Sequence, residues 1–283
     1  GLANITAPPL GAFLLEILPM QNILAIDVAT AIIAITPLFF IPIPRPLRAG
    51  TPEEGQPSAL ADLRAALRYM WAWKGGMFLL IGAMMINLLA IPAFSLLPIL
   101  ATNHFGGGAY EFAWLQSAMG IGTVLGGLTL GVWGGFKKRI VTGMLALILA
   151  GISIATVGIT PATLLMLAVA AMFSAGFMLP ITNGSLFAIL QTTVPPDMQG
   201  RVFTLLMSGA TAMTPLGLAI AGPVADSLGV QVWFLVGGIA MIAIGITAFF
   251  VPAIMRIEEK TSQNTTSHLN ERTMDGADHR DPT

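Results

Sequence analysis

Side chains that could carry a proton are few in the apolar part of this sequence. Four carboxylates, Glu16, Asp27, Glu111 and Asp226, lie near the ends of long apolar runs and not at their middles. A carboxylate inside a membrane is a candidate proton carrier, and Asp27 is the best one because it lies several residues into its run. We expect the other three to be solvated at a membrane surface.

Residues suited to metal binding or catalysis do not cluster in the sequence. The three histidines, His104, His268 and His279, are far apart, and there is no cysteine. Metal or acid–base chemistry needs such groups close together. The sequence also lacks the Gly-x-x-x-x-Gly-Lys-Ser/Thr loop that holds ATP phosphates. It therefore predicts no enzyme active site, no metal and no cofactor.

Neutral polar side chains within the apolar runs are the other candidates for function. In lipid such groups usually face the interior of a helix bundle. They could form hydrogen bonds with a passing solute, or they could hold neighbouring helices together, and both interpretations stay open. The candidates for a solute pathway are Asn87, Gln116, Asn183, Ser208 and Thr211, with Asn87 preferred because it lies near the middle of its run.

The composition requires a membrane around these residues. Hydrophobic residues make up 55% of the 283 positions and charged residues only 10%, with a mean hydropathy of +0.81. A soluble domain carries roughly a quarter charged residues. Residues 140–196 contain no Asp, Glu, Lys or Arg, which is enough chain for two membrane helices of about 20 residues each. The net charge of −1 gives no sign of nucleic-acid binding.

The apolar runs are continuous and lack the alternation of a membrane barrel, so an all-α polytopic fold is expected. Eight membrane helices are predicted, at residues 2–18, 22–41, 77–101, 112–133, 140–159, 162–188, 202–225 and 231–253. A charged, proline-rich linker over 42–75 contains an amphipathic helix from Ser58 to Trp73. The chain thus divides into 1–41, 42–75, a six-helix bundle over 76–254, and a polar tail over 255–283 that we expect to be disordered.

Basic residues indicate which side of the membrane each loop faces. With these helices, all 13 Lys and Arg fall on one side, in the linker, the 134–139 loop, the 189–201 loop and the tail. The positive-inside rule makes this side cytoplasmic. The linker and the C-terminus are therefore predicted to be cytoplasmic.

Charged residues at this side are candidates for a gate. Arg201 follows Asp197 by four residues at the start of a helix, and Lys137, Lys138 and Arg139 fill a short loop. Such charges can lock helix ends together in one conformation of a protein that alternates between two states. The alternative is that they only set the orientation or contact anionic lipid.

Small residues and prolines predict how the helices pack and bend. The pairs Gly122/Gly126 and Gly127/Gly131 are spaced one turn apart, which permits close contact between helices. Proline removes a backbone hydrogen bond and tends to kink or break a helix. Pro92, Pro98, Pro180 and Pro215 interrupt apolar helices in this way.

Several runs resemble those of a known family. They are residues 183–191, 194–203 with Gly200-Arg201-Val202, 215–217 and 221–226. The chain resembles the major facilitator superfamily over roughly 1–255, closest to the drug-exporter branch with macrolide-efflux and enterobactin-exporter-like proteins. Residues 8–11 and 26–30 look like that family's hairpin of helices 5 and 6. The 131–139 loop is similar to its basic loop between helices 8 and 9, but lacks the acidic residue.

This resemblance implies a major-facilitator-type bundle in which the chain provides helices 5 to 12 of twelve, without the first four. It implies gradient-driven efflux of small amphipathic molecules or drugs by alternating access, as an antiporter in a bacterial inner membrane. The expected partners are a small-molecule substrate, a proton as coupling ion and membrane lipid. The alternative is a half-size or non-transporting membrane subunit of a larger complex.

Overall fold

The computed structural model describes residues 59–255 and Ile257, with a few positions between Asn22 and Thr36. The side chains of residues 59–62 and of Asp197 are not part of that description. Outside the described residues lie the expected helix at 2–18, most of the expected helix at 22–41, the linker up to residue 58 and the tail beyond Ile257. Their predictions therefore stay predictions.

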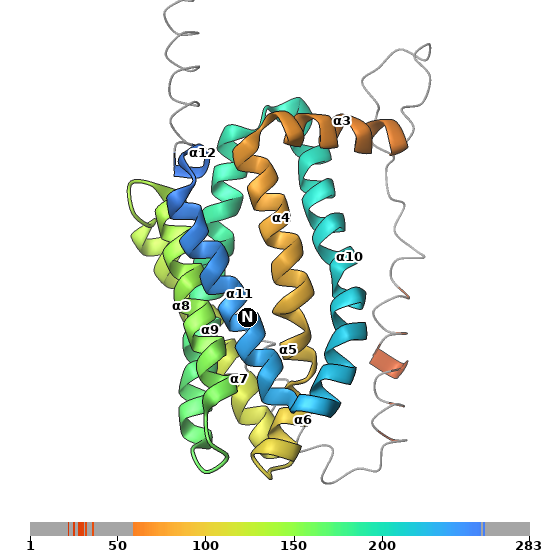
Figure 1. The fold of residues 1–283 in the computed structure, drawn as a ribbon, viewed down its shortest axis with the longest axis vertical. Coiled ribbons are helices and arrows are strands. Elements are labelled where there is room, and N and C mark those ends of the chain that lie inside the picture. Colours follow the sequence, from red (N-terminus) through yellow and green to blue (C-terminus); the bar gives the residue numbers. More distant parts are fainter. Residues whose placement is uncertain are drawn as a thin grey trace, which may run out of the picture.

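Six long apolar helices form the described bundle, running alternately up and down (Figure 1). Each is long and apolar enough to cross a membrane, and each corresponds to one of the last six predicted helices. No strand occurs among the described residues, so the expected all-α fold is confirmed. The helices are α4 (Lys74–Leu89, continued by α5 to Ser95), α7 (Ala109–Trp133), α8 (Arg139–Ile159), α9 (Leu165–Thr193), α10 (Pro196–Leu228) and α11 (Val230–Phe250).

A shorter helix, α3 (Ala59–Ala72), lies across one end of the bundle (Figure 1). It buries Ala66 and Met70 completely, while Leu63 and Leu67 stay more than 40% exposed. At its C-terminus the ring of Tyr69 contacts that of Trp73, which precedes α4. Leu63 and Leu67 thus give α3 an apolar edge that the bundle does not cover. Such an edge is typical of a helix that lies at a membrane surface.

Among the six helices that the structure describes, prolines coincide with a break in one. After α4, the chain continues as α5 (Ile91–Ser95), α6 (Leu97–Ile99) and the π-helix η2 (Leu100–His104). Pro92 and Pro98 lie at the starts of α5 and α6, where a missing backbone N–H costs nothing. Pro180 and Pro215 instead lie inside the continuous helices α9 and α10.

Neighbouring helices pack in the order α7, α9, α8, α11, α4 and α10. Close contact between α7 and α9 depends on Gly122 and Gly126, which face the α9 backbone at Phe173 and Phe177. At the second predicted pair, Gly127/Gly131, an added Cβ atom would have no atom of another described helix within 4 Å. One pair is thus a packing surface and the other is not. A short segment, α12 (Pro252–Met255), follows α11 near the start of α4.

Candidate functional site

The side of α10 away from the bundle carries an exposed polar stripe. Thr204, Ser208 and Thr211 are spaced four and three residues apart, so they lie on one face of the helix, and all three are exposed. α10 packs chiefly against α4, with smaller contacts to α3 and α11. This face of α10 is therefore the polar surface that the described helices leave open.

The hydroxyl groups of this stripe are available to a ligand. Within residues 59–255, neither Ser208 nor Thr211 donates a side-chain hydrogen bond. Hydroxyls elsewhere, such as those of Thr123, Thr192 and Thr247, donate to the carbonyl four residues earlier in their own helices. A hydroxyl in a dry environment gains from any polar partner it meets, so this stripe favours a polar solute.

Asn87, the preferred pathway residue, differs from Ser208 and Thr211 because its side chain forms hydrogen bonds within the protein. Its Nδ2 donates to the Ala83 carbonyl at 2.9 Å, and its Oδ1 accepts from Thr214 Oγ1 at 3.5 Å. Thr214 is on α10, so the amide joins α4 to α10. The structure therefore places the Asn87 amide in a contact between two helices, and its role in a solute pathway stays a prediction.

Gln116 and Asn183 complete the set of predicted pathway residues. Gln116 is half-buried on α7 and Asn183 is exposed on α9. Neither amide takes part in a hydrogen bond in the described part of the chain. With Ser208 and Thr211, they provide uncommitted polar groups on three helices.

The predicted gate residues lie at the end of the bundle that α3 covers. Lys137, Lys138 and Arg139 are exposed between α7 and α8, after Gly134 and Gly135 with φ of 73° and 84°. Such left-handed backbone favours glycine and ends α7 with a sharp turn. The turn is held by Thr142 Oγ1, which accepts from the N–H of Phe136 at 2.8 Å.

Arg201 lies at the same end, on the first turns of α10. Its guanidinium Nη1 lies 3.8 Å from Met198 Sδ. The side chain of its predicted partner, Asp197, lies outside the described residues, as does the proton-carrier candidate Asp27. The structure therefore shows where Arg201 lies, while its role in a gate and its pairing with Asp197 stay predictions.

At the opposite end, His104 joins three segments that sequence reasoning left unconnected. Its Nε2 lies 2.8 Å from the Thr160 carbonyl, which it bonds as a donor, and its Nδ1 accepts from the Gln231 amide. The contact links η2, the α8–α9 turn and the start of α11. One histidine in a loop gives no periodic signal, so only the fold reveals its partners. No group of three or more His, Asp or Glu that could bind a metal occurs among the described residues.

Comparison with known proteins gives a family for this arrangement of helices. The family model of the Major Facilitator Superfamily matches residues 1–217. Macrolide efflux protein A of Streptococcus pyogenes is 26% identical over 259 residues, which covers 92% of this chain and 64% of that protein. Multidrug efflux pump Tap of Mycolicibacterium fortuitum is 31% identical over 215 residues, covering 74% of this chain and 51% of Tap.

These alignments span between half and two thirds of the length of the relatives. The family model covers most of the chain, from its first residue into α10. The relatives are named as efflux proteins, which indicates a transporter family and not an enzyme family. The six apolar helices agree with a multi-pass membrane protein. The chain therefore belongs to the major facilitator superfamily.

Proposed function

We propose that this chain exports small amphipathic molecules or drugs across a bacterial inner membrane by alternating access, driven by a proton gradient. Two of the relatives are named for macrolide and multidrug efflux. The observation that carries the proposal is the open polar face of α10, where the Ser208 and Thr211 hydroxyls lack intramolecular partners within the described chain. A solute can supply those partners.

The chemistry of this face suits amphipathic substrates. Met207, which is 50% exposed, and Leu216, which is 53% exposed, lie on α10 close to the free hydroxyls. Apolar contact gives most of the binding free energy, and a few hydroxyls and amides orient the solute. Methionine adapts to varied shapes, which favours a broad substrate range.

The proposal includes the orientation of the protein in the membrane and a gate at its cytoplasmic side. The described basic residues are Arg64, Arg68, Lys74, the Lys137–Arg139 run and Arg201, and all lie toward the α3 end of the bundle. We assign this end to the cytoplasm on the positive-inside rule. Arg201 would then close the cytoplasmic side in one of the two conformations, with Asp197 as its nearest acidic residue in the sequence. Asp27 is the proposed proton carrier.

Transport by the full-length protein in proteoliposomes tests the pathway. Uptake of radiolabelled erythromycin into inside-out vesicles is measured with an imposed proton gradient. The double variant Ser208→Ala/Thr211→Val should slow transport about thirtyfold, because two lost hydrogen bonds of about 1 kcal/mol each sum to about 2 kcal/mol. The control Thr247→Val removes an exposed hydroxyl on α11 that already bonds to Ala243, and should leave the rate unchanged.

Arg201→Ala should reduce transport while the protein inserts normally, since the variant removes the gate cation and no membrane-buried group. Normal efflux by correctly inserted Arg201→Ala protein would refute the gate. Gradient-independent movement of erythromycin would refute proton coupling. A full-length protein that moves no solute in any of these assays would favour the alternative, a non-transporting membrane subunit.

A further inference from the structure

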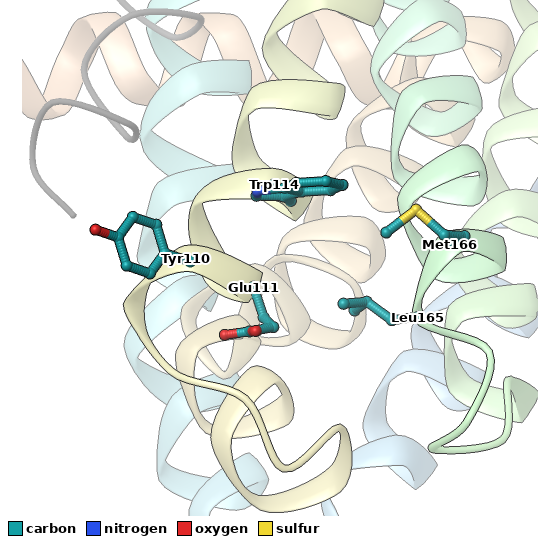
Figure 2. Close-up of a pocket in the computed structure, with 5 residues that line it drawn as sticks. All are labelled: Tyr110, Glu111, Trp114, Leu165 and Met166. Atoms are coloured by element: carbon teal, nitrogen blue, oxygen red, sulfur yellow. The ribbon is translucent and has the colours of Figure 1, made fainter. Parts of the chain in front are cut away.

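A second candidate site lies at the end of the bundle opposite α3, between the starts of α7 and α9. Figure 2 shows Trp114 projecting from α7 toward Met166 of α9, with Leu165 beside Met166, Glu111 on the first turn of α7 and the Tyr110 ring turned away from α9. The five residues line a cavity of about 350 Å³. That volume is within the range of small-molecule sites, which start near 300 Å³.

One wall of this pocket carries a fixed negative charge. Glu111 Oε2 accepts from the backbone N–H of Gly108 at 2.5 Å, so the carboxylate caps the start of α7 and is held in place. No Lys or Arg occurs over residues 75–136 or 140–200, which include both walls of the pocket. Within the described chain Glu111 makes no ion pair. None of the described residues therefore neutralises its charge.

The rest of the pocket is aromatic and apolar. Tyr110 is 48% exposed and Trp114 is 54% exposed, one helical turn apart on the same face of α7. Aromatic ring faces attract cations, and the attraction is strongest for Trp. Leu165 and Met166, on the other wall, offer contact for a hydrocarbon chain. The set of one carboxylate, two aromatic rings and two aliphatic side chains matches an organic ammonium ion attached to an apolar chain.

We propose that this pocket binds the ammonium group of an amphiphile at the membrane surface. The site is separate from the open face of α10 and does not depend on the proposed export. Two sources could supply that chemistry: the amine head group of a phospholipid, and a soluble cationic amphiphile. Aromatic residues at the end of a membrane helix lie at head-group level, so both sources reach the pocket.

Native mass spectrometry of the full-length protein in a neutral detergent tests the site without any transport measurement. One arm titrates phosphatidylethanolamine against phosphatidylglycerol with the same acyl chains. The other arm titrates dodecyltrimethylammonium against dodecyl maltoside. Glu111→Gln removes the charge but keeps an oxygen that can accept from Gly108. Asp226→Asn is the matched control, since Asp226 is an exposed carboxylate at the same end, near the C-terminus of α10.

The expected result is saturable binding of an ammonium amphiphile that is about fivefold weaker in Glu111→Gln and unchanged in Asp226→Asn, as for a partly exposed ion pair. A Glu111-dependent preference for phosphatidylethanolamine identifies lipid as the source. A Glu111 dependence confined to dodecyltrimethylammonium identifies a soluble cation. The proposal is overturned if neither ligand distinguishes Glu111→Gln from the wild type, or if Asp226→Asn weakens binding equally.

Discussion

The contact between α7 and α9 leaves no room for a side chain at Gly126. A Cβ atom there would lie 2.0 Å from the carbonyl oxygen of Phe177, which is 1.4 Å less than the shortest ordinary contact of 3.4 Å. At Gly122 the corresponding distance to the Phe173 oxygen is 2.2 Å. The obstructing atoms belong to the backbone of α9 and cannot rotate away, so Gly126→Ala must push the two helices apart.

The neighbouring Gly127 provides a matched control for this substitution. It is exposed, and a Cβ atom there has nothing within 4 Å. Both alanine variants gain about 1 kcal/mol of helix propensity. Only Gly126→Ala also incurs the overpacking cost of about 1–3 kcal/mol, and we expect the upper end because the backbone must move. Gly126→Ala should therefore be about 2–3 kcal/mol less stable than Gly127→Ala.

Thermal unfolding of the two full-length variants in the same detergent, followed by tryptophan fluorescence, measures this difference. For a protein of this size 1 kcal/mol corresponds to about 2–4 °C, so the two midpoints should differ by about 5–10 °C. Equal midpoints, or a lower one for Gly127→Ala, would show that α7 and α9 do not meet at Gly126. The assignment of the close contact to the Gly122/Gly126 pair would then be wrong.

Two other substitutions test the turns at the ends of the helices, by the same unfolding measurement. Thr142→Val keeps the shape of a 2% exposed side chain but leaves the Phe136 N–H without its acceptor, and should cost about 1–3 kcal/mol; an unchanged midpoint would mean that water replaces the hydroxyl. His104→Phe keeps a ring but removes the bonds to Thr160 and Gln231, and should cost about 1–2 kcal/mol. His104→Phe as stable as the wild type would show that this contact does not hold the three segments together.

Long apolar runs and the position of charges were enough to predict the six described helices. Each run is bounded by charged residues, glycine or proline. The loops that contain Lys and Arg all fall on one side of the membrane only if the chain crosses the membrane once in each run. The helices predicted at 162–188 and 202–225 are continuous through Pro180 and Pro215, whereas the helix predicted at 77–101 is broken at Pro92 and Pro98, and the prolines alone do not predict this difference. Neighbouring helices and local adjustments can satisfy the freed carbonyls in a membrane, and these are tertiary effects that a local rule does not include.

The roles of the polar residues could not be ranked from the sequence, because a buried amide can bind a neighbour or a solute with the same groups. The central position of Asn87 predicts a pathway residue, and the fold adds that its amide also contacts Thr214 on a neighbouring helix. Ser208 is on the same helix as Thr214 but on its exposed face. Each residue along α10 is rotated by about 100° from the one before, so this rotation decides which polar side chains face a neighbouring helix and which face a possible solute pathway. The sequence gives the rotation, but only the fold shows which helices lie on each side of α10.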